Sequence, residues 1–199
     1  MPDPPEPHDV RERHDVRGRM VRGAATLLAR DGLAGTSFGT VLALTGAPRG
    51  SIYHHFPGGK QELVAEATRL TGRTLLDLLP TLPHGDAGEV TAGWCRVWRG
   101  VLERSDAGSG CAVAAVLTSA AATTVEAEAA AAVFAGWTEA LAELLVRAGV
   151  RAAAAPGLAS TLIAGVEGAL VLARAEHGLT AYDEVTASLV LLARTVAAT

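Results

Sequence analysis

Apolar residues recur at every third or fourth position along most of this chain, which is the spacing of one face of an α-helix. Over residues 15–30, for example, Met20, Ala24 and Leu28 share a face, and the arginines lie on the other faces. No segment alternates apolar and polar residues over the length of a strand with β-branched side chains. The pattern therefore predicts an all-α fold with about nine helices.

Glycine and proline mark where these helices should end. Gly32 lies where the first helix should stop, Gly46 follows the second, and Pro80 follows the fourth. Either Thr36 or Ser37 can cap the start of the second helix. The helices that we expect cover residues 15–30, 37–45, 48–55, 60–79, a segment that contains residues 94–101 and ends near 106, 111–122, 124–148, 156–177 and 181–196.

The same boundaries predict three regions. Residues 1–14 contain four prolines and alternating charges with nothing to bury, so we expect a flexible arm there. Residues 15–59 hold three short helices joined by glycine turns, the layout of a helix-turn-helix domain. Residues 60–199 form the helical body.

Composition narrows the class of protein further. The chain has 199 residues, of which 49% are hydrophobic and 19% charged, so it can bury a sizeable core. The two cysteines are not spaced as a CxxC motif, and the polar start does not resemble a signal peptide, so we expect a reduced, cytoplasmic protein. The charge-free stretch 107–125 is broken by glycine, serine and threonine, and we expect no membrane partner.

Charge is distributed unevenly. Residues 10–60 contain eight Arg or Lys and three Asp or Glu, a net charge of +5. Residues 61–199 contain nine Arg or Lys and fifteen Asp or Glu, a net charge of −6. A basic head fits a polyanionic partner, although arginines on a helix are also common on ordinary solvated faces.

The helix-turn-helix region carries a recognisable set of motifs. They are TSF at residues 36–38, GAP at 46–48 and GSIYHHF at 50–56, followed by Lys60 and Leu63. In this order, from Gly32 to Leu63, the segment resembles the DNA-binding domain of tetracycline-repressor (TetR) family transcription regulators. The resemblance implies that double-stranded operator DNA is a partner.

The third helix of this motif should bury one side and present the other to DNA. Ile52 and Phe56, four residues apart, form the inward side, and Arg49 can pair with a guanine edge. The candidates for phosphate contacts are Thr36, Ser51, Tyr53, His54 and Lys60. The resemblance implies backbone contacts for Tyr53, His54 and Lys60; purely structural roles for Tyr53 and Lys60 are the alternative.

Other chemistries find little support. His54 and His55 are adjacent and would point about 100° apart on a helix, so they cannot share one metal ion. Residues 57–60 fail the phosphate-loop pattern because His54 replaces its first glycine and Gln61 its hydroxyl residue. No nucleophile motif occurs. We expect no metal, no cofactor and no enzyme activity.

The body resembles one branch of the same family, which includes lincomycin-resistance and flavonoid-responsive repressors. The resemblance rests on residues 110–116 and 166–175, although Ala112 stands where that branch usually has proline. It implies a ligand cavity between the middle helices and a homodimer contact through the last two. Large rings beside small residues suit an apolar or aromatic small molecule. The pocket candidates are Trp94, Trp98, Cys111, Leu117, Phe134 and Trp137.

Each of these choices has an alternative. The tryptophans can instead fill the core, and Cys111 can be a small buried side chain rather than a sensor. The apolar stripe that we expect at the dimer interface consists of Leu162, Val166, Leu170, Ala173, Leu189, Leu192 and Val196. That stripe can instead pack against the body of its own subunit.

The function that we expect is therefore that of a DNA-binding regulator, a repressor that an apolar or aromatic molecule releases from its operator. One alternative is an all-α enzyme or scaffold that retains an unused helix-turn-helix. Another is a constitutive DNA-binding protein whose tryptophans fill its own cavity.

Overall fold

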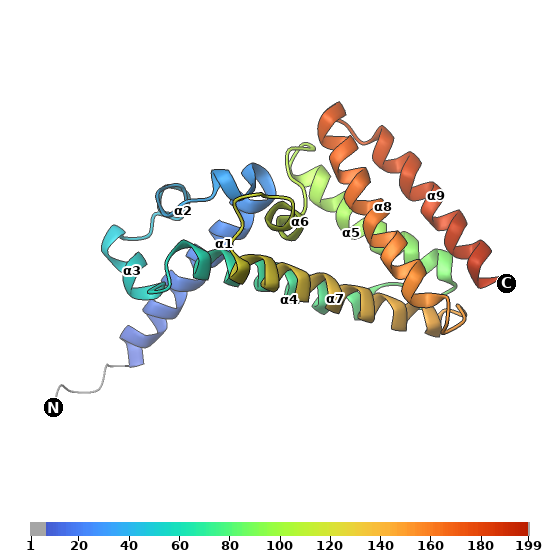
Figure 1. The fold of residues 1–199 in the computed structure, drawn as a ribbon, viewed down its shortest axis with the longest axis horizontal. Helices are drawn as coiled ribbons and strands as arrows, with labels where there is room; N and C mark the ends of the chain where they lie inside the picture. The colour runs from blue at the N-terminus through green and yellow to red at the C-terminus, as the bar shows by residue number, and fades with distance from the viewer. Residues whose placement is uncertain (1–6, 199) are drawn as a thin grey trace.

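The structure is a computed structural model that describes residues 7–198 (Figure 1). Over that range it contains nine α-helices and no strand, which confirms the predicted all-α fold. The elements are α1 (Pro7–Gly35), α2 (Phe38–Thr45), the 3-10 turn η1 (Arg49–Ser51), α3 (Ile52–His55), α4 (Lys60–Leu78), the 3-10 turn η2 (Leu79–Thr81), α5 (Ala87–Arg104), α6 (Ala112–Leu117), α7 (Thr124–Arg147), α8 (Ala155–Glu176) and α9 (Thr180–Ala197).

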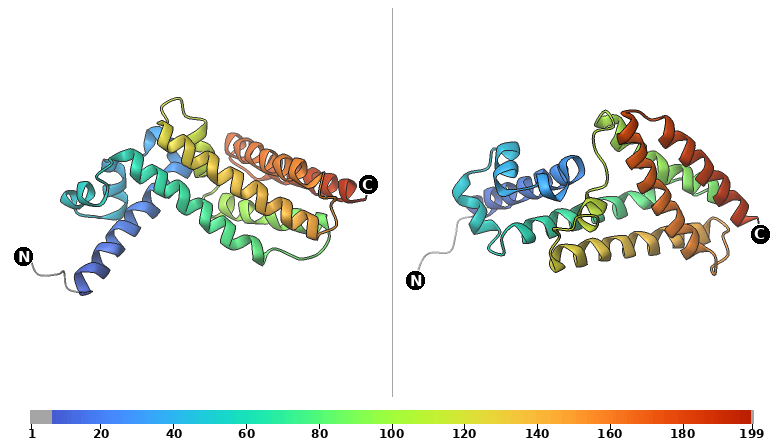
Figure 2. Two further views of the ribbon diagram at one scale, coloured as in Figure 1. Left: turned by 60° about the horizontal axis from the view of Figure 1, so that its bottom comes forward. Right: turned by 45° about the horizontal axis from the view of Figure 1, so that its top comes forward.

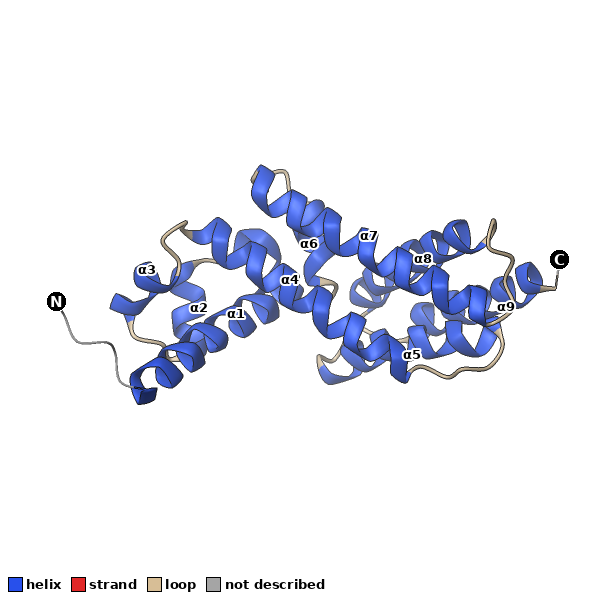
Figure 3. Cartoon of the chain, turned by 90° about the horizontal axis from the view of Figure 1, so that it is seen from below, coloured by secondary structure: helices blue, strands red, loops and turns tan. Residues whose placement is uncertain are grey.

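A small head lies at one end of the molecule and a larger body at the other (Figures 1 and 2). Helices α1, α2 and α3 form the head. Helix α4 starts in the head and runs along α7 through the body, and the view from below shows it as the connection between the two parts (Figure 3). Helices α8 and α9 pack on each other at the far end, and α5 packs against α9.

Arg17 fixes the head to α4. Its guanidinium forms a two-pronged ion pair with Glu66, lies 3.5 Å from Glu62 and sits 4.9 Å above the centre of the Phe56 ring. A forked guanidinium suits such a paired contact with a carboxylate. One arginine of α1 therefore ties α1, the end of α3 and the start of α4 together.

The second helix begins and ends at residues suited to those positions. Ser37 accepts a hydrogen bond from the Thr40 N–H at 3.1 Å, and the Thr40 hydroxyl accepts one from the Ser37 N–H at 2.8 Å. This capping box decides between the two candidate caps in favour of Ser37. At the other end Gly46 has φ +65°, a conformation that glycine adopts without strain, and its N–H binds the Leu42 carbonyl.

Two helices begin or end earlier than the sequence predicts. Helix α1 already starts at Pro7, where proline suits a first turn, and residues 8–14 contain no proline or glycine to interrupt it. Of the expected arm at 1–14, residues 1–6 lie outside the described part of the chain. Helix α6 ends at Leu117 instead of residue 122, because the Ser119 hydroxyl accepts the Ala121 N–H at 3.3 Å in place of a helical carbonyl.

The expected third helix over residues 48–55 is also divided. Residues 49–51 form the 3-10 turn η1, and α3 itself is a single turn. Pro48 is extended, and its carbonyl accepts both the N–H and the hydroxyl of Ser51, at 3.0 and 2.7 Å. These local bonds stabilise the tighter turn. We call residues 49–56, which comprise η1, α3 and Phe56, the recognition element.

By length and composition alone, α7 and α8 are apolar enough to cross a membrane. Both are core helices of the body: α7 packs against α4, and α8 packs against α7 and α9. These neighbours cover part of each helix: 33% of the most apolar stretch of α7 and 44% of that of α8 are buried.

Candidate DNA-binding and ligand-binding sites

The recognition element presents one polar side to the solvent. Ile52 and Phe56 are 1% and 0% exposed and anchor α3 in the head. Arg49 and His54 are exposed, and Tyr53 is 72% exposed. The Tyr53 ring stands edge-on to Phe38, with ring centres 5.6 Å apart, a contact that helps to hold the exposed ring in place. This arrangement agrees with the inward and outward sides that the sequence predicts.

The predicted phosphate contact of Thr36 is not compatible with its position in the structure. Its side chain is 0% exposed, and its hydroxyl donates to the Gly32 carbonyl at 2.8 Å. The chain turns at Gly32, where φ is +71°, and this turn buries Thr36 beneath the end of α1. Thr36 is therefore a structural residue of the head and not a phosphate contact.

Two further DNA candidates have structural bonds of their own. The Lys60 ammonium donates to the Leu33 carbonyl at 3.0 Å, which joins the start of α4 to α1. An ammonium has three donors, so this bond leaves two for a phosphate. Ser51 is partly buried, and its hydroxyl donates to Pro48 as described above. Phosphate contacts by Lys60 and Ser51 remain predictions.

The three tryptophans form a closed cluster in the middle of the body. Trp94, Trp98 and Trp137 are 1%, 5% and 0% exposed, and their ring centres lie 5.9 to 6.4 Å apart in edge-to-face arrangements. Phe134 extends the cluster at 5.3 Å from Trp137. The Trp137 indole N–H donates to the Gly72 carbonyl of α4 at 3.1 Å. The rings thus pack on one another, which favours the core-filling alternative.

The other two pocket candidates lie at the two ends of α6. Leu117 is 42% exposed, at the end of the short helix α6. Cys111 is buried at the start of the same helix, where its sulfur accepts the Ala114 N–H at 3.4 Å. Burial raises the pKa of the Cys111 thiol, and the nearby Glu167 carboxyl raises it further; burial also raises the pKa of Glu167 to about 7. A thiol in this environment is protonated and inert, consistent with a structural role.

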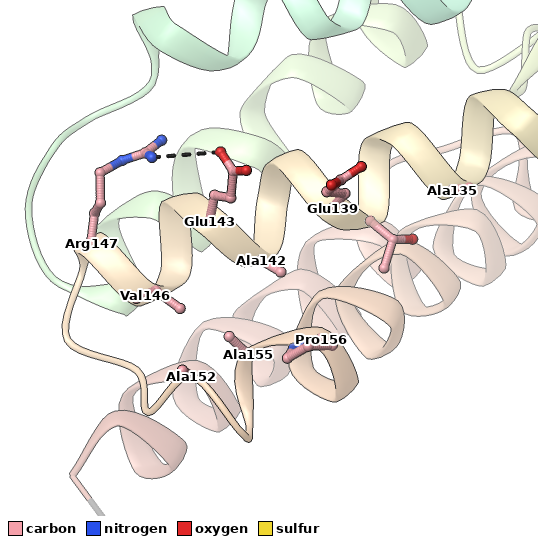
Figure 4. Close-up of a pocket in the computed structure, with 10 residues that line it drawn as sticks. Ala135, Glu139, Ala142, Glu143, Val146, Arg147, Ala152, Ala155 and Pro156 are labelled. Atoms are coloured by element: carbon pink, nitrogen blue, oxygen red, sulfur yellow. Dashed lines mark ion pairs between the residues drawn. The ribbon is translucent and has the colours of Figure 1, made fainter.

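Two of the hollows on the surface of the body are large and mostly apolar. One is a groove of about 410 Å³ between α1, α4 and α5, and Trp98 lines it. The other, of about 790 Å³, lies between the end of α7 and the start of α8 (Figure 4). Its walls are short side chains such as Ala142 and Ala155, with Glu143 and Arg147 3.8 Å apart at its rim.

Apart from Trp98, the residues that line the first groove are not among those predicted from the sequence. Thr71, Thr74 and Leu78 recur on α4, and Val97 and Val101 recur on α5, at helical spacing. This second, weaker apolar stripe on each helix is the signal that could have revealed the groove. Only the fold brings the two stripes together.

The expected dimer residues also need correction. Five of the seven are buried inside the subunit, because the stripe that they form packs against the body: these are Leu162, Val166, Leu170, Ala173 and Leu189, none more than 8% exposed. Leu192 is 38% exposed, and Val196 is partly buried. Gly165 shows how closely the stripe packs, since a Cβ there would lie 2.8 Å from a Leu189 methyl group.

A different apolar surface remains open on the same two helices. It consists of Val171 and Leu172 on α8 and Leu191 and Leu192 on α9, which are 38 to 67% exposed. We call these four residues the α8/α9 face. Several large apolar side chains exposed on neighbouring helices are typical of a protein contact surface.

Among residues 16–198, whose side chains the structure describes, no group of three or more His, Cys, Asp or Glu residues could hold a metal ion.

The comparisons with known proteins agree with this geometry. Residues 87–188 match the family of LmrA/YxaF-like transcriptional regulator C-terminal domains, and residues 21–67 match the bacterial regulatory proteins of the tetR family. The chain is 34% identical over 180 residues to the uncharacterized HTH-type transcriptional regulator Rv0196 of Mycobacterium tuberculosis (strain ATCC 25618 / H37Rv), an overlap that covers 84% of this chain and 88% of the relative.

Solved structures show the same fold. The regulatory protein TetR from Rhodobacter sphaeroides superposes with a TM-score of 0.78 at 20% identity, over 88% of this chain and 97% of that one. The multidrug binding protein EbrR, complexed with imidazole, superposes with a TM-score of 0.59 at 20% identity, over 88% and 93%. One family model matches the head, a second matches about half of the chain, and a relative aligns over most of its length. This chain therefore belongs to the TetR family of transcriptional regulators, is not an enzyme, and has an LmrA/YxaF-like C-terminal domain.

Proposed function

We propose that this regulator is a homodimeric repressor that a small apolar or aromatic molecule releases from its operator in the cytoplasm. The observation that supports DNA binding is the two-sided recognition element. Its apolar residues Ile52 and Phe56 are buried. Its polar residues Arg49, Tyr53 and His54 face solvent. Residues 15–59 would bind DNA, and residues 60–199 would bind the ligand and the second subunit.

Dimerisation would occur through the α8/α9 face. An operator read by a two-fold dimer has half-sites about 34 Å apart, one turn of DNA. A small molecule that binds best when the two heads do not match this spacing must weaken DNA binding, because linkage is reciprocal. The multidrug binding protein EbrR, which has this fold and is complexed with imidazole, supports the idea that a protein of this fold can hold a small molecule.

Selection of bound sites from random double-stranded DNA tests this function. We expect a palindrome, because two identical heads related by a two-fold axis read the same bases on opposite strands. Enrichment of no sequence, or of a single half-site without symmetry, would contradict the proposal. The alternative is a DNA-binding regulator that responds to no small molecule. The tryptophan cluster favours this alternative, because the rings fill the space that a ligand would occupy between them.

Removal of the Tyr53 ring should weaken DNA binding by about the same factor for every sequence. A hydroxyl that contacts phosphate carries no base information. We therefore expect Tyr53→Ala to lower the affinity for the selected operator and for random DNA in parallel, and Tyr53→Phe to reproduce the loss if the hydroxyl makes the contact. Fluorescence anisotropy with both DNAs measures this. Wild-type affinity of both variants would remove Tyr53 from the DNA interface.

A charge placed in the α8/α9 face should dissociate the dimer. Leu172 is 46% exposed in the subunit, so Leu172→Glu leaves the fold intact but would place an unpaired carboxylate in the proposed interface. We expect a monomer in sedimentation velocity and a much lower operator affinity. Val125→Glu, at a similarly exposed position of α7, is the matched control and should remain dimeric. A dimer of wild-type affinity for Leu172→Glu would place the interface elsewhere.

A further inference from the structure

The groove between α1, α4 and α5 combines apolar walls with a positively charged rim. Its volume is about 410 Å³, the size of a pocket for a small organic molecule. The uncharged residues of its walls are Ala25, Thr26, Leu70, Thr71, Thr74, Leu75, Leu78, Val97, Trp98 and Val101. The threonine hydroxyls of residues 26, 71 and 74 donate to carbonyls of their own helices, so the walls act as apolar surface.

The two charged residues of the groove are both arginines. Arg22 comes from α1 and Arg104 from the end of α5, and no acidic residue is found among the described lining residues. Each side chain lies back along its own helix over a glycine: a Cβ on Gly18 would be 3.1 Å from the Arg22 guanidinium, and one on Gly100 would be 3.0 Å from that of Arg104. These glycines give the guanidinium groups room beside the groove.

Arg104 is available to a ligand. Its guanidinium forms no hydrogen bond or ion pair with any side chain or carbonyl in the described part of the chain, although it borders a largely apolar space. An arginine in such a position attracts a carboxylate, sulfonate or phenolate, which can accept two parallel hydrogen bonds from the guanidinium. The walls would accept the apolar part of the same molecule.

We propose that this groove binds a small molecule that carries an apolar ring system and one anionic group, and that its occupancy changes the affinity of the head for DNA. The effect on DNA rests on the proposed function; the binding itself does not. The site differs from the pocket predicted around the tryptophans, because the cluster is filled by its own rings and only the Trp98 side of it borders the groove.

The position of the groove explains how occupancy can reach the DNA-binding face. One wall belongs to α1, which is part of the head, and the opposite wall belongs to α5 of the body. Helix α4 lies between them and is tied to the head through Arg17–Glu66 and Lys60–Leu33. A molecule that bridges α1 and α5 therefore acts directly on the angle between head and body.

The larger hollow between α7 and α8 is less suited to such a ligand. Glu139 and Glu143 line it with a single arginine, Arg147, which lies 3.8 Å from Glu143. Its walls contain no aromatic side chain among the described lining residues (Figure 4). An anion would thus meet a net negative rim there and a net positive rim in the α1/α4/α5 groove.

Two dyes with the same rings test the proposal on the full-length protein. The probe is 8-anilinonaphthalene-1-sulfonate, and N-phenyl-1-naphthylamine is its uncharged counterpart. We expect saturable binding of the sulfonate, with energy transfer from tryptophan, and a two- to fivefold weaker affinity in Arg104→Gln. The uncharged dye should bind that variant and the wild type equally. Arg151→Gln, which removes an exposed arginine away from the groove, is the control and should change neither affinity.

A second variant blocks the groove from both sides. Thr26 and Thr74 are exposed, one on α1 and one on α4, and Thr26→Phe combined with Thr74→Phe would fill the space between them. We expect at least a tenfold loss of sulfonate binding with an unchanged melting temperature. Unchanged sulfonate binding in both Arg104→Gln and the double phenylalanine variant would overturn the proposal, since the dye would then bind elsewhere.

The DNA readout separates this proposal from the proposed function. If the sulfonate binds in the groove and lowers the affinity for the selected operator in the wild type but not in the double phenylalanine variant, both are supported. If it binds in the groove without changing DNA affinity, the coupling is overturned and the DNA-binding function stands. If no operator is selected but groove binding persists, the proposed function fails and the binding site stands.

Discussion

Trp137→Ala should destabilise the protein by about 3–5 kcal/mol, because it removes a large, fully buried ring from a well-packed site. Trp137 contacts Trp94, Trp98 and Phe134, and its N–H donates to the Gly72 carbonyl of α4. The variant therefore leaves a cavity between α4 and α7 and removes the hydrogen bond that joins the two helices there. For a chain of this length we expect the melting temperature to fall by roughly 6–20 °C.

Two other variants separate packing from hydrogen bonding at this site. Trp137→Phe retains part of the ring volume and loses the hydrogen bond, so it should cost less than Trp137→Ala. Val146→Ala, on the same helix but 42% exposed, should stay within about 0.5 kcal/mol of the wild type. Differential scanning calorimetry beside operator binding measures the effect. A Trp137→Ala protein of wild-type stability that has lost only its response to a small molecule would show that the cluster is a ligand cavity after all.

Arg49→Ala should lower the affinity for the operator by about 1–3 kcal/mol, and the loss should be confined to one or two base positions. Arg49 is exposed at the start of the recognition element, beside the anchored Ile52, where the first residues of such a helix meet base edges. A guanidinium can bind the two acceptors of guanine at once, so its removal should make the affected positions indifferent to base identity.

Competition with operators that carry single base-pair substitutions provides the measurement. Arg151→Ala removes the same charge from an exposed site between α7 and α8 and should leave the preference unchanged. An Arg49→Ala protein with weaker binding to all sequences alike would make Arg49 a phosphate contact. An unchanged affinity would remove it from the interface.

The DNA-binding head follows from its sequence to a large extent. The glycine at position 46, the serine cap at 37 and the apolar pair Ile52 and Phe56 act over a few residues, so their roles can be read along the chain. Thr36 is the exception. Whether its hydroxyl faces solvent depends on the turn at Gly32, whose direction is set by the packing of α1 against α2.

The body shows what a hydrophobic pattern cannot specify. Periodicity indicates which side of a helix is apolar, but a helix of the body and a helix of a second subunit satisfy that side equally well. Leu162, Val166 and Leu170 were expected at a dimer interface for this reason and lie in the core of the subunit instead. The tryptophans are likewise expected to line a ligand cavity, with core filling as the alternative, and in the structure they pack on one another.

The sequence by itself determined the all-α class, most helix positions, the basic head and the buried side of the recognition element at Ile52 and Phe56, because each depends on local spacing or on a turn of a few residues. The tertiary structure decided which apolar stripes face each other, which remain exposed on α8 and α9, and that α1, α4 and α5 enclose a groove with Arg22 and Arg104 at its rim. Those outcomes depend on contacts between segments far apart in the chain. The physical reason is that the hydrophobic effect is non-directional, so an apolar side chain is stabilised by any apolar partner that excludes water.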